Sequence, residues 1–281
     1  MKLTNRHGIA SCIGIQALCI PLLYSFSLSA PAVSSLEGTP LAERSSGDSS
    51  GLASGIEGVV VRSTGAIEAD VQRFRSLLGN PNNGATPGEA PEGRREINWD
   101  AVPAAVTNVI DFPATFFNVN SPRGLVYDQV SRGLEVSDNR FTDINPTYAS
   151  EFNPFSGQKM FSAIGNNEAS VQFLVAGSSE RATVRGIGVV FLDVDSKDSS
   201  GIILIGEDGS TLGRILAPAR SDARGASFVG VVFQNPLIAR ARIVAGDGIL
   251  SPDEDDVSQG GRHDLVVMDD FLYGEPTGPR H

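Results

Sequence analysis

Cysteine and histidine are scarce in this chain of 281 residues, which has two cysteines and three histidines. Cys12 and Cys19 both lie near the N-terminus, so the rest of the chain has no thiol. This excludes disulfide bridges, zinc-thiolate sites and cysteine nucleophiles from that part of the chain. After His7 the remaining histidines are His263, in a glycine-rich stretch, and the terminal His281, which disfavours a Ser-His-Asp triad.

Basic residues are also few, with 22 Lys and Arg against 33 Asp and Glu and a formal net charge of -11. Nucleic acids and anionic membrane surfaces repel such a chain, so we expect neither as a partner, and a cation fits better. The 31 glycines and 16 prolines follow no triplet period, which indicates many turns and excludes collagen and coiled coil.

An export signal is predicted over residues 1–32. Lys2, Arg6 and His7 form its polar head, residues 9–30 carry no charge, and small residues place the cleavage near Ala30 or Ala32. The alternative is an uncleaved membrane anchor, although Pro21 and several serines interrupt the apolar run. Cleavage predicts a secreted or cell-surface protein without a membrane span.

The remaining sequence divides by composition into five segments. A Ser/Gly-rich flexible spacer is followed by a short strand and an amphipathic helix, with Ser63 or Thr64 as its N-cap. We expect this helix to pack on the main domain rather than to bind a separate partner. The predicted boundaries are 33–55 for the spacer, 56–79 for the strand and helix, 80–95 for a Pro/Asn/Gly-rich linker, 96–276 for the main domain and 277–281 for a tail.

The main domain alternates short apolar runs with turn residues, which predicts an all-β, antiparallel β-sandwich of jelly-roll type. Runs that are apolar on both faces indicate central strands covered on both sides. The expected strands are 115–119, 124–127, 133–136, 170–176, 186–194, 201–205, 212–217, 227–233, 237–245 and 264–273.

Two neighbouring acids, Asp269 and Asp270, lie among apolar residues of the last expected strand. Strand alternation places Asp269 on the face of Val267 and Phe271, and Asp270 on the opposite face. A carboxylate facing the core is costly unless a cation or hydrogen bonds satisfy it. We therefore predict a structural calcium site formed by Asp269, Asp270 and Asp100; the alternative is an arginine partner or a capping role in the adjoining turn.

Two further acidic stretches, 193–198 and 247–256, compete for the same ion. Neither has the spacing of an EF-hand loop. We interpret each as a solvated acidic turn, although such a loop can collect calcium weakly where the ion is abundant.

Carbohydrate binding needs exposed aromatic rings, because a ring face stacks on the apolar side of a sugar. Trp99, Tyr148, Phe152 and Phe155 are the candidate ligand-binding residues, the last three in one long loop. Phenylalanine outnumbers Trp and Tyr by 14 to 5, so packing in the core is the alternative for most aromatics. No catalytic constellation is recognised, although two carboxylates brought together by folding would suit a glycosidase.

Several stretches together resemble a group of bacterial secreted jelly-roll domains, including those of uncharacterised exported and PEP-CTERM-associated proteins. The similarity covers residues 95–276. Its main motifs are Glu96-Ile-Asn-Trp-Asp100, Gly188-Val-Val-Phe-Leu-Asp-Val-Asp195, Ser227-Phe-Val-Gly-Val-Val-Phe233 and Met268-Asp-Asp-Phe-Leu-Tyr-Gly-Glu-Pro276.

The last strand is also similar to that of carbohydrate-binding jelly rolls. That resemblance implies that Asp269 or Asp270 holds a structural calcium together with Asp100. The chain lacks the Pro-Glu-Pro motif, membrane helix and basic end of the sorted group, so free secretion is expected.

These observations predict a secreted, non-catalytic binding or surface-associated module that is stabilised by calcium and binds carbohydrate. The alternatives are an extracellular glycoside hydrolase and a purely structural envelope protein.

Overall fold

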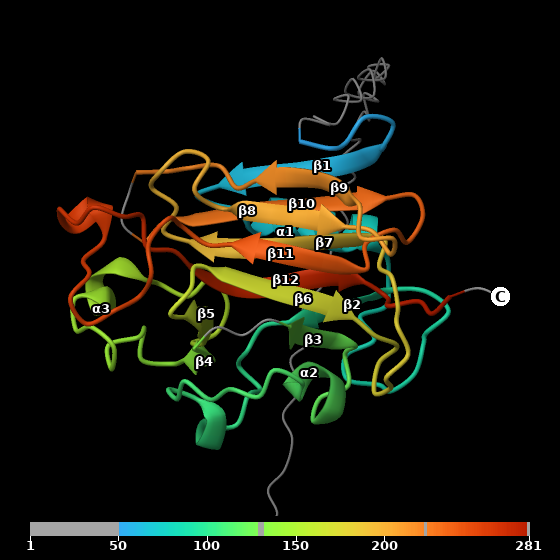
Figure 1. Cartoon of the computed structure of the whole chain (residues 1–281), viewed down its shortest axis with the longest axis horizontal. Helices are drawn as coiled ribbons and strands as arrows, with labels where there is room; N and C mark the ends of the chain where they lie inside the picture. Colours follow the sequence, from blue (N-terminus) through green and yellow to red (C-terminus); the bar gives the residue numbers. More distant parts are fainter. Residues whose placement is uncertain (1–50, 129–131, 222–223, 280–281) are drawn as a thin grey trace, which may run out of the picture. The chain divides into compact units, whose positions relative to one another are not determined.

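The computed structural model describes residues 51–128, 132–221 and 224–279 (Figure 1). The predicted signal peptide and the spacer as far as residue 50 lie outside the described residues. The described chain belongs to one unit. No helix within it is long and apolar enough to cross a membrane.

Two antiparallel sheets make up the fold, as predicted. The larger sheet contains β1 (Gly58–Thr64), β2 (Arg94–Ile97), β4 (Gly133–Ser137), β5 (Met160–Ile164), β7 (Gly186–Leu192), β10 (Ala226–Phe233) and β12 (Val267–Gly274). The smaller sheet contains β3 (Leu125–Asp128), β6 (Glu168–Phe173), β8 (Gly201–Ile205), β9 (Thr211–Leu216) and β11 (Arg240–Val244).

The strand order is that of a jelly roll. Strands β5 to β12 divide into the orders β5-β12-β7-β10 and β6-β11-β8-β9, so the first strand pairs with the last, the second with the last but one, and so on inward. This is the double-sheet arrangement of an eight-stranded jelly roll. The remaining strands extend it: β1 pairs with β10, β2 with β12, β3 with β6 and β4 with β5.

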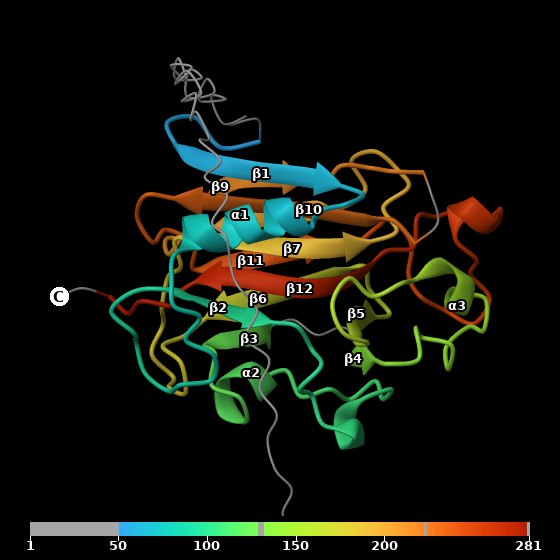
Figure 2. The same cartoon turned by 180° about the vertical axis from the view of Figure 1, so that it is seen from behind.

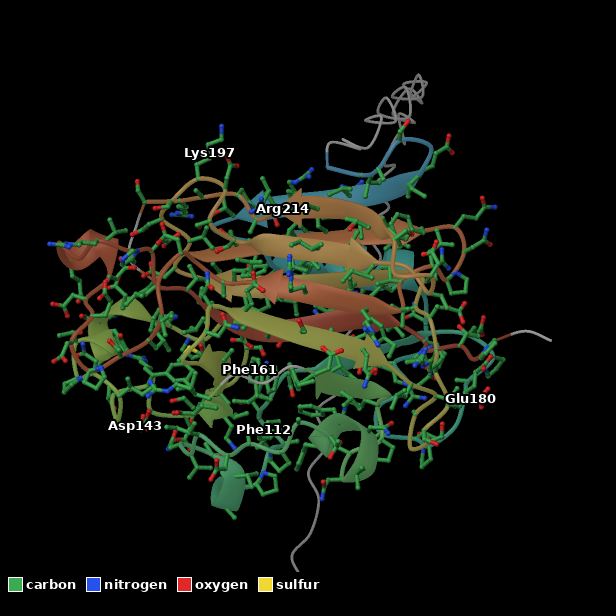
Figure 3. The ribbon with its side chains drawn as sticks, in the orientation of Figure 1. Phe112, Asp143, Phe161, Glu180, Lys197 and Arg214 are labelled. Carbon is green, nitrogen blue, oxygen red and sulfur yellow. The ribbon has the colours of Figure 1, made fainter. Side chains whose placement is uncertain are left out.

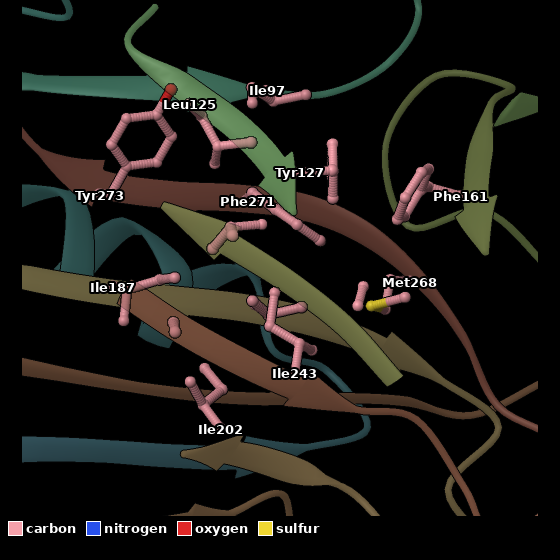
Figure 4. Packing of buried hydrophobic residues seen from close by; sticks show 14 of the residues in the cluster. Ile97, Leu125, Tyr127, Phe161, Ile187, Ile202, Ile243, Met268, Phe271 and Tyr273 are labelled. Carbon is pink, nitrogen blue, oxygen red and sulfur yellow. The ribbon is translucent and has the colours of Figure 1, made fainter. Parts of the chain in front are cut away.

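The main core lies between the two sheets, where residues such as Ile187, Ile202 and Ile243 meet (Figure 4). All seven residues of β7 are buried, because the second sheet covers one face and other elements cover the outer face. In β8, by contrast, Ile203 and Ile205 are half-buried, so the outer face of the smaller sheet is less covered than the apolar run predicts.

Helix α1 (Glu68–Leu78) lies on the outer face of the larger sheet (Figure 2), where Val71, Phe74 and Leu78 are buried. The predicted packing on the main domain is confirmed. Gly188 and Gly230 face each other on β7 and β10, and a Cβ at either would lie within 2.7 Å of the Phe74 ring. The predicted caps are wrong: Ile67 occupies the N-cap position without a side-chain hydrogen bond.

Residues 115–119 are the clearest disagreement with the predicted strands. They form the short helix α2 (Phe116–Val119) after a turn closed by Pro113. A strand would place Phe116 and Phe117 on opposite faces, whereas the helical turn lets both rings join one aromatic cluster. Strand β5 was not predicted. The other short elements are η1 (Ala104–Val106), α3 (Tyr148–Glu151) and η2 (Val257–Gln259).

The predicted spacer and linker both make contacts with the sandwich. Leu52, in the spacer, forms a bridge with Gly213 of β9. In the linker, the buried Arg95 donates hydrogen bonds to the carbonyl oxygens of Gly84, Thr86 and Gly88 and pairs with Glu275 at 2.6 Å. The segment 80–95 is therefore anchored along its length.

Candidate metal centre

A β-bulge determines where Asp269 and Asp270 point. The register between β12 and β7 shifts between Met268 and Phe271. Over this stretch the chain advances by three residues on β12 but by only two on β7, which is a β-bulge. Met268 and Phe271 both face the core between the sheets, while Val267 and Leu272 face the outer cluster. Alternation from either side therefore places both carboxylates on the outer face, and the predicted opposite placement is wrong.

Both carboxylates receive hydrogen bonds from the loop that precedes β5. Asp269 Oδ2 accepts from the backbone N–H groups of Phe155 (2.6 Å) and Ser156 (3.2 Å). Asp270 Oδ1 accepts from Ser156 Oγ at 2.6 Å, and its other oxygen pairs with Arg75 of α1 at 3.3 Å. These donors match the alternative to calcium at Asp269 and Asp270, an arginine partner or a capping role in the adjoining turn.

Asp100 holds the same loop from another side. Its Oδ1 accepts from the backbone N–H groups of Gln158 (2.8 Å) and Lys159 (3.3 Å). Gly157 passes so close to the Asp100 carboxylate that a Cβ would collide with it, and its φ of 54° lies in the left-handed region. Among the described residues, Asp100, Asp269 and Asp270 do not form a group whose ligand atoms converge.

Burial still raises the pKa of Asp269, to about 8, and the Asp270 carboxylate adds to this shift while the Ser156 and Phe155 donors oppose it. Burial also raises the pKa of Asp270, against the opposing effects of Ser156 and Arg75. Burial and the neighbouring charge therefore disfavour ionisation of this pair, whereas the hydrogen-bond donors and Arg75 favour it.

Three of the four aromatic candidates are not exposed platforms. Tyr148 and Phe152 are fully buried and pack on each other at 5.5 Å, and Trp99 is 1% exposed. Their prediction as sugar-stacking surfaces is wrong, because these rings complete hydrophobic clusters. Phe155 alone of the four is half-buried.

A different set of acids does converge. The carboxylate oxygens of Glu151, Asp193 and Asp256 lie within 4.8 Å of one another, and so do those of Asp195, Asp256 and Asp264. Asp256 belongs to both groups, so the five acids form one cluster, which we call the acidic centre. Four of them are at most 1% exposed, and Asp195 is half-buried.

Four separate segments supply the acidic centre. Glu151 ends α3, labelled in Figure 1, and Asp193 and Asp195 follow β7. Asp256 is the N-cap of η2 and accepts from the Ser258 N–H at 2.6 Å. Asp264 lies just before β12, where its backbone N–H donates to Asp247. The centre therefore ties the loops at one end of the sandwich together.

The donors around the acidic centre are unevenly shared. Asp264 accepts from the backbone N–H groups of Asp195 and Ser196 and from Ser199 Oγ. Asp193 Oδ1 accepts from the Arg224 backbone N–H at 3.0 Å. Asp193 Oδ2 and Asp195 Oδ1, however, are buried without a hydrogen-bond donor in the part of the chain described. Their neighbours Glu151 and Asp256 are themselves carboxyls, so a hydrogen bond to them requires a proton on one of the two groups.

No cationic side chain pairs with the acidic centre within the described ranges. Lys197, in the same loop as Asp195, is exposed and points away from the sheets (Figure 3). Arg224 directs its guanidinium to the carbonyl oxygens of Ser150 and Ala149. Burial raises the pKa of Asp193 to about 10, and a hydrogen bond between the protonated Asp193 and Glu151, together with the charge of Glu151, adds to the shift.

Ionisation is also disfavoured in the group of Asp195, Asp256 and Asp264. Burial raises the pKa of Asp195 to about 6, with further contributions from Asp256 and Asp264. Burial also raises the pKa of Asp264 despite its three donors. These all-oxygen groups of buried carboxylates fit a hard divalent cation such as calcium, because an ion in each group would lie beside the residue that has an unpaired oxygen, Asp193 in one and Asp195 in the other.

Sequence reasoning found the acidic stretches 193–198 and 247–256 but interpreted them as solvated turns. Burial of Asp193 and Asp256 overturns that interpretation. Glu151 and Asp264 were not singled out as ligands, because each is one acid in an otherwise mixed segment. Only the fold brings them beside the others.

Comparison with known proteins adds no identity: no family model matches the chain, and no curated protein matches it.

Proposed function

We propose that this chain is a secreted, non-catalytic binding module in which calcium, held at the acidic centre, orders the loop end of a jelly-roll sandwich. The observation that supports the metal is the pair of buried oxygens Asp193 Oδ2 and Asp195 Oδ1. They lack hydrogen-bond donors in the described structure, and their neighbours in the two groups that share Asp256 are other carboxyls. Ionising these buried carboxyls without a counter-charge is costly, which is why burial raises their pKa values, and a divalent cation removes that cost by taking the place of the proton.

Calcium suits the centre better than the common alternatives. Zinc and copper favour histidine or thiolate ligands, which are absent from the five acids. Magnesium usually keeps several waters and uses only one or two carboxylates. A carboxylate-rich protein cage is the chemistry that calcium accepts, and at least one ion per chain is expected.

The ligand surface that fits this proposal lies beside the acidic centre. A polar pocket of about 420 Å³ is lined in part by Phe155, Asn153 and Arg224. Arg224 also caps Asp193 through its backbone N–H. Phe155 would supply the ring face for a sugar and the polar residues its hydroxyl partners, so carbohydrate is the proposed ligand class.

The decisive experiment for calcium is thermal unfolding of the full chain in calcium and in EDTA. Calcium at about 100 times its dissociation constant stabilises by about 2.7 kcal/mol, which corresponds to a rise in melting temperature of about 5 to 10 °C. Asp193→Asn should remove the rise. Asp253→Asn, an exposed acid of the same loop as Asp256, is the matched control and should keep it.

An unchanged wild-type melt in EDTA, with calcium shown to be removed, would contradict the metal assignment. Ligand binding is tested separately with a glycan array, comparing the wild type with Phe155→Ala. Release of reducing sugar from a bound glycan would favour the hydrolase alternative. Absence of any glycan binding would favour the structural envelope protein.

A further inference from the structure

A second, apolar pocket lies away from the acidic centre and shares no residue with it. Its volume is about 350 Å³, within the range of small-molecule sites. The segment after β2 and helix α2 form most of its wall. The lining includes Trp99, Val102, Phe116, Phe117, Asn120 and Arg123.

The aromatic wall of this pocket is held rigidly. The Trp99 ring stacks on Phe161 with centroids 4.3 Å apart and meets Phe117 edge-on at 5.4 Å. Phe112, labelled with Phe161 in Figure 3, meets the Trp99 ring edge-on with centroids 6.3 Å apart. The indole Nε1–H donates to the Asp269 carbonyl at 2.8 Å. The pocket is therefore formed before any ligand arrives.

The backbone at Trp99 has a φ of 67°, in the left-handed region. Such a conformation is a genuine outlier for a bulky aromatic residue, and it persists only when the surrounding structure enforces it. Strain of this kind is concentrated at binding sites, so Trp99 marks the pocket independently of its volume.

Arg123 is an unneutralised cation in the lining. Its Nε donates to the Glu96 carbonyl at 3.0 Å, its Nη1 to Ser121 Oγ, and its guanidinium lies 5.8 Å from the centre of the Phe117 ring. No carboxylate pairs with it in the described part of the chain, whereas Arg95 nearby is paired with Glu275. Burial lowers the pKa of Arg123, and Arg95 adds to this effect.

We infer that this pocket binds a small organic monoanion, a carboxylic acid with a compact apolar body. The carboxylate would take the vacant hydrogen-bonding capacity of the Arg123 guanidinium, which suits a planar carboxylate. The apolar body would lie against Phe116 and Pro103, and the buried rings of Trp99 and Phe117 would form the base of the pocket. Arg123 is the one charged residue in the lining of this pocket, so it selects for an anion.

The test uses the chain's one tryptophan, Trp99, as the reporter. Cyclohexanecarboxylate is titrated into the full chain while Trp99 emission is recorded, beside cyclohexylmethanol as the neutral match and acetate as the anion without an apolar body. We expect saturable binding of the acid that is about tenfold tighter than that of the alcohol, equal to about 1.4 kcal/mol. Acetate should not saturate.

Arg123→Met should weaken the acid about tenfold, to the level of the alcohol, and leave the alcohol unchanged. Arg242→Met, an exposed arginine of β11, is the matched control. If Arg123→Met does not fold, added salt serves instead, because it should weaken the acid and not the alcohol. Equal binding of acid and alcohol by the wild type, or no saturation by the acid, would overturn the inference. The result should be the same in EDTA, which separates it from the calcium proposal.

Discussion

Two buried groups of acids on this sandwich differ in what surrounds them. At the β12 bulge, Asp269 and Asp270 accept hydrogen bonds from Phe155 and Ser156, and Arg75 supplies a positive charge. In the acidic centre, Asp193 and Asp195 each have a buried oxygen without a hydrogen-bond donor in the described structure, and no cation pairs with either. Both groups have raised pKa values, so burial alone does not separate them.

The comparison shows that a buried acid indicates a metal only when the protein's own donors are too few. Loop 155–159 donates the hydrogen bonds that satisfy Asp100, Asp269 and Asp270. An ion at these acids would have to displace backbone N–H groups. The acidic centre has more carboxylate oxygens than hydrogen-bond donors. A divalent ion would supply the positive charge that this centre lacks.

The largest expected effect comes from removing the donor-satisfied acid. Asp269→Ala leaves the Phe155 and Ser156 N–H groups without their acceptor and should lower the free energy of unfolding by about 3 kcal/mol. The loss should be equal in calcium and in EDTA. Urea unfolding in both buffers measures it, and a loss confined to calcium would make Asp269 a metal ligand and reverse the comparison.

Asp193→Asn should behave in the opposite way. In calcium it should lower the free energy of unfolding by about 2 to 3 kcal/mol, because the stabilising ion no longer binds. In EDTA it should leave stability nearly unchanged near neutral pH, because burial raises the pKa of Asp193 to about 10 and its carboxyl is already uncharged there. The same urea curves test this, and an equal loss in both buffers would indicate a packing role without metal.

Glu135 provides a third case, a buried acid of β4 that neither donors nor a metal group satisfies. Neither of its carboxylate oxygens has a hydrogen-bond donor in the described chain. The pKa rises to about 8, mainly through burial and further through the charge of Asp143 and a hydrogen bond to it from the protonated Glu135. The folded state therefore holds this proton at pH values where the unfolded chain has lost it.

Stability from Glu135 should be full below its unfolded pKa and should decline as pH rises towards the folded value of about 8. The expected slope is about 1 kcal/mol per pH unit near pH 6, and Glu135→Gln should flatten it. Urea unfolding of both proteins in saturating calcium, between about pH 5 and pH 7, checks this. A wild-type curve parallel to that of the variant would show that Glu135 is ionised in the folded protein.

The sandwich was predictable because it follows from local patterns. Runs such as 201–205 and 227–233 combine apolar, β-branched residues with glycine or proline breaks, and strands form at or close to those positions. Residues 115–119 misled because paired phenylalanines suit a strand and a helical turn equally, and the long-range aromatic cluster decided between them.

The candidate site was not predictable to the same degree. The acids of residues 269–270 were correctly placed among apolar neighbours, but a bulge is a property of strand pairing and left no sign that would put both on one face. Glu151 and Asp256 lie 105 residues apart in sequence, and their approach depends on how α3 and η2 pack at the end of the sandwich.

Calorimetric titration of calcium into the EDTA-stripped full chain distinguishes the acidic centre from the acids of the β12 bulge as the calcium site. Saturable binding of at least one ion is expected for the wild type and for Asp269→Asn, and its loss is expected in Asp193→Asn. Binding that survives in Asp193→Asn but disappears in Asp269→Asn, or no binding by the wild type at millimolar calcium, would contradict the assignment of calcium to the acidic centre.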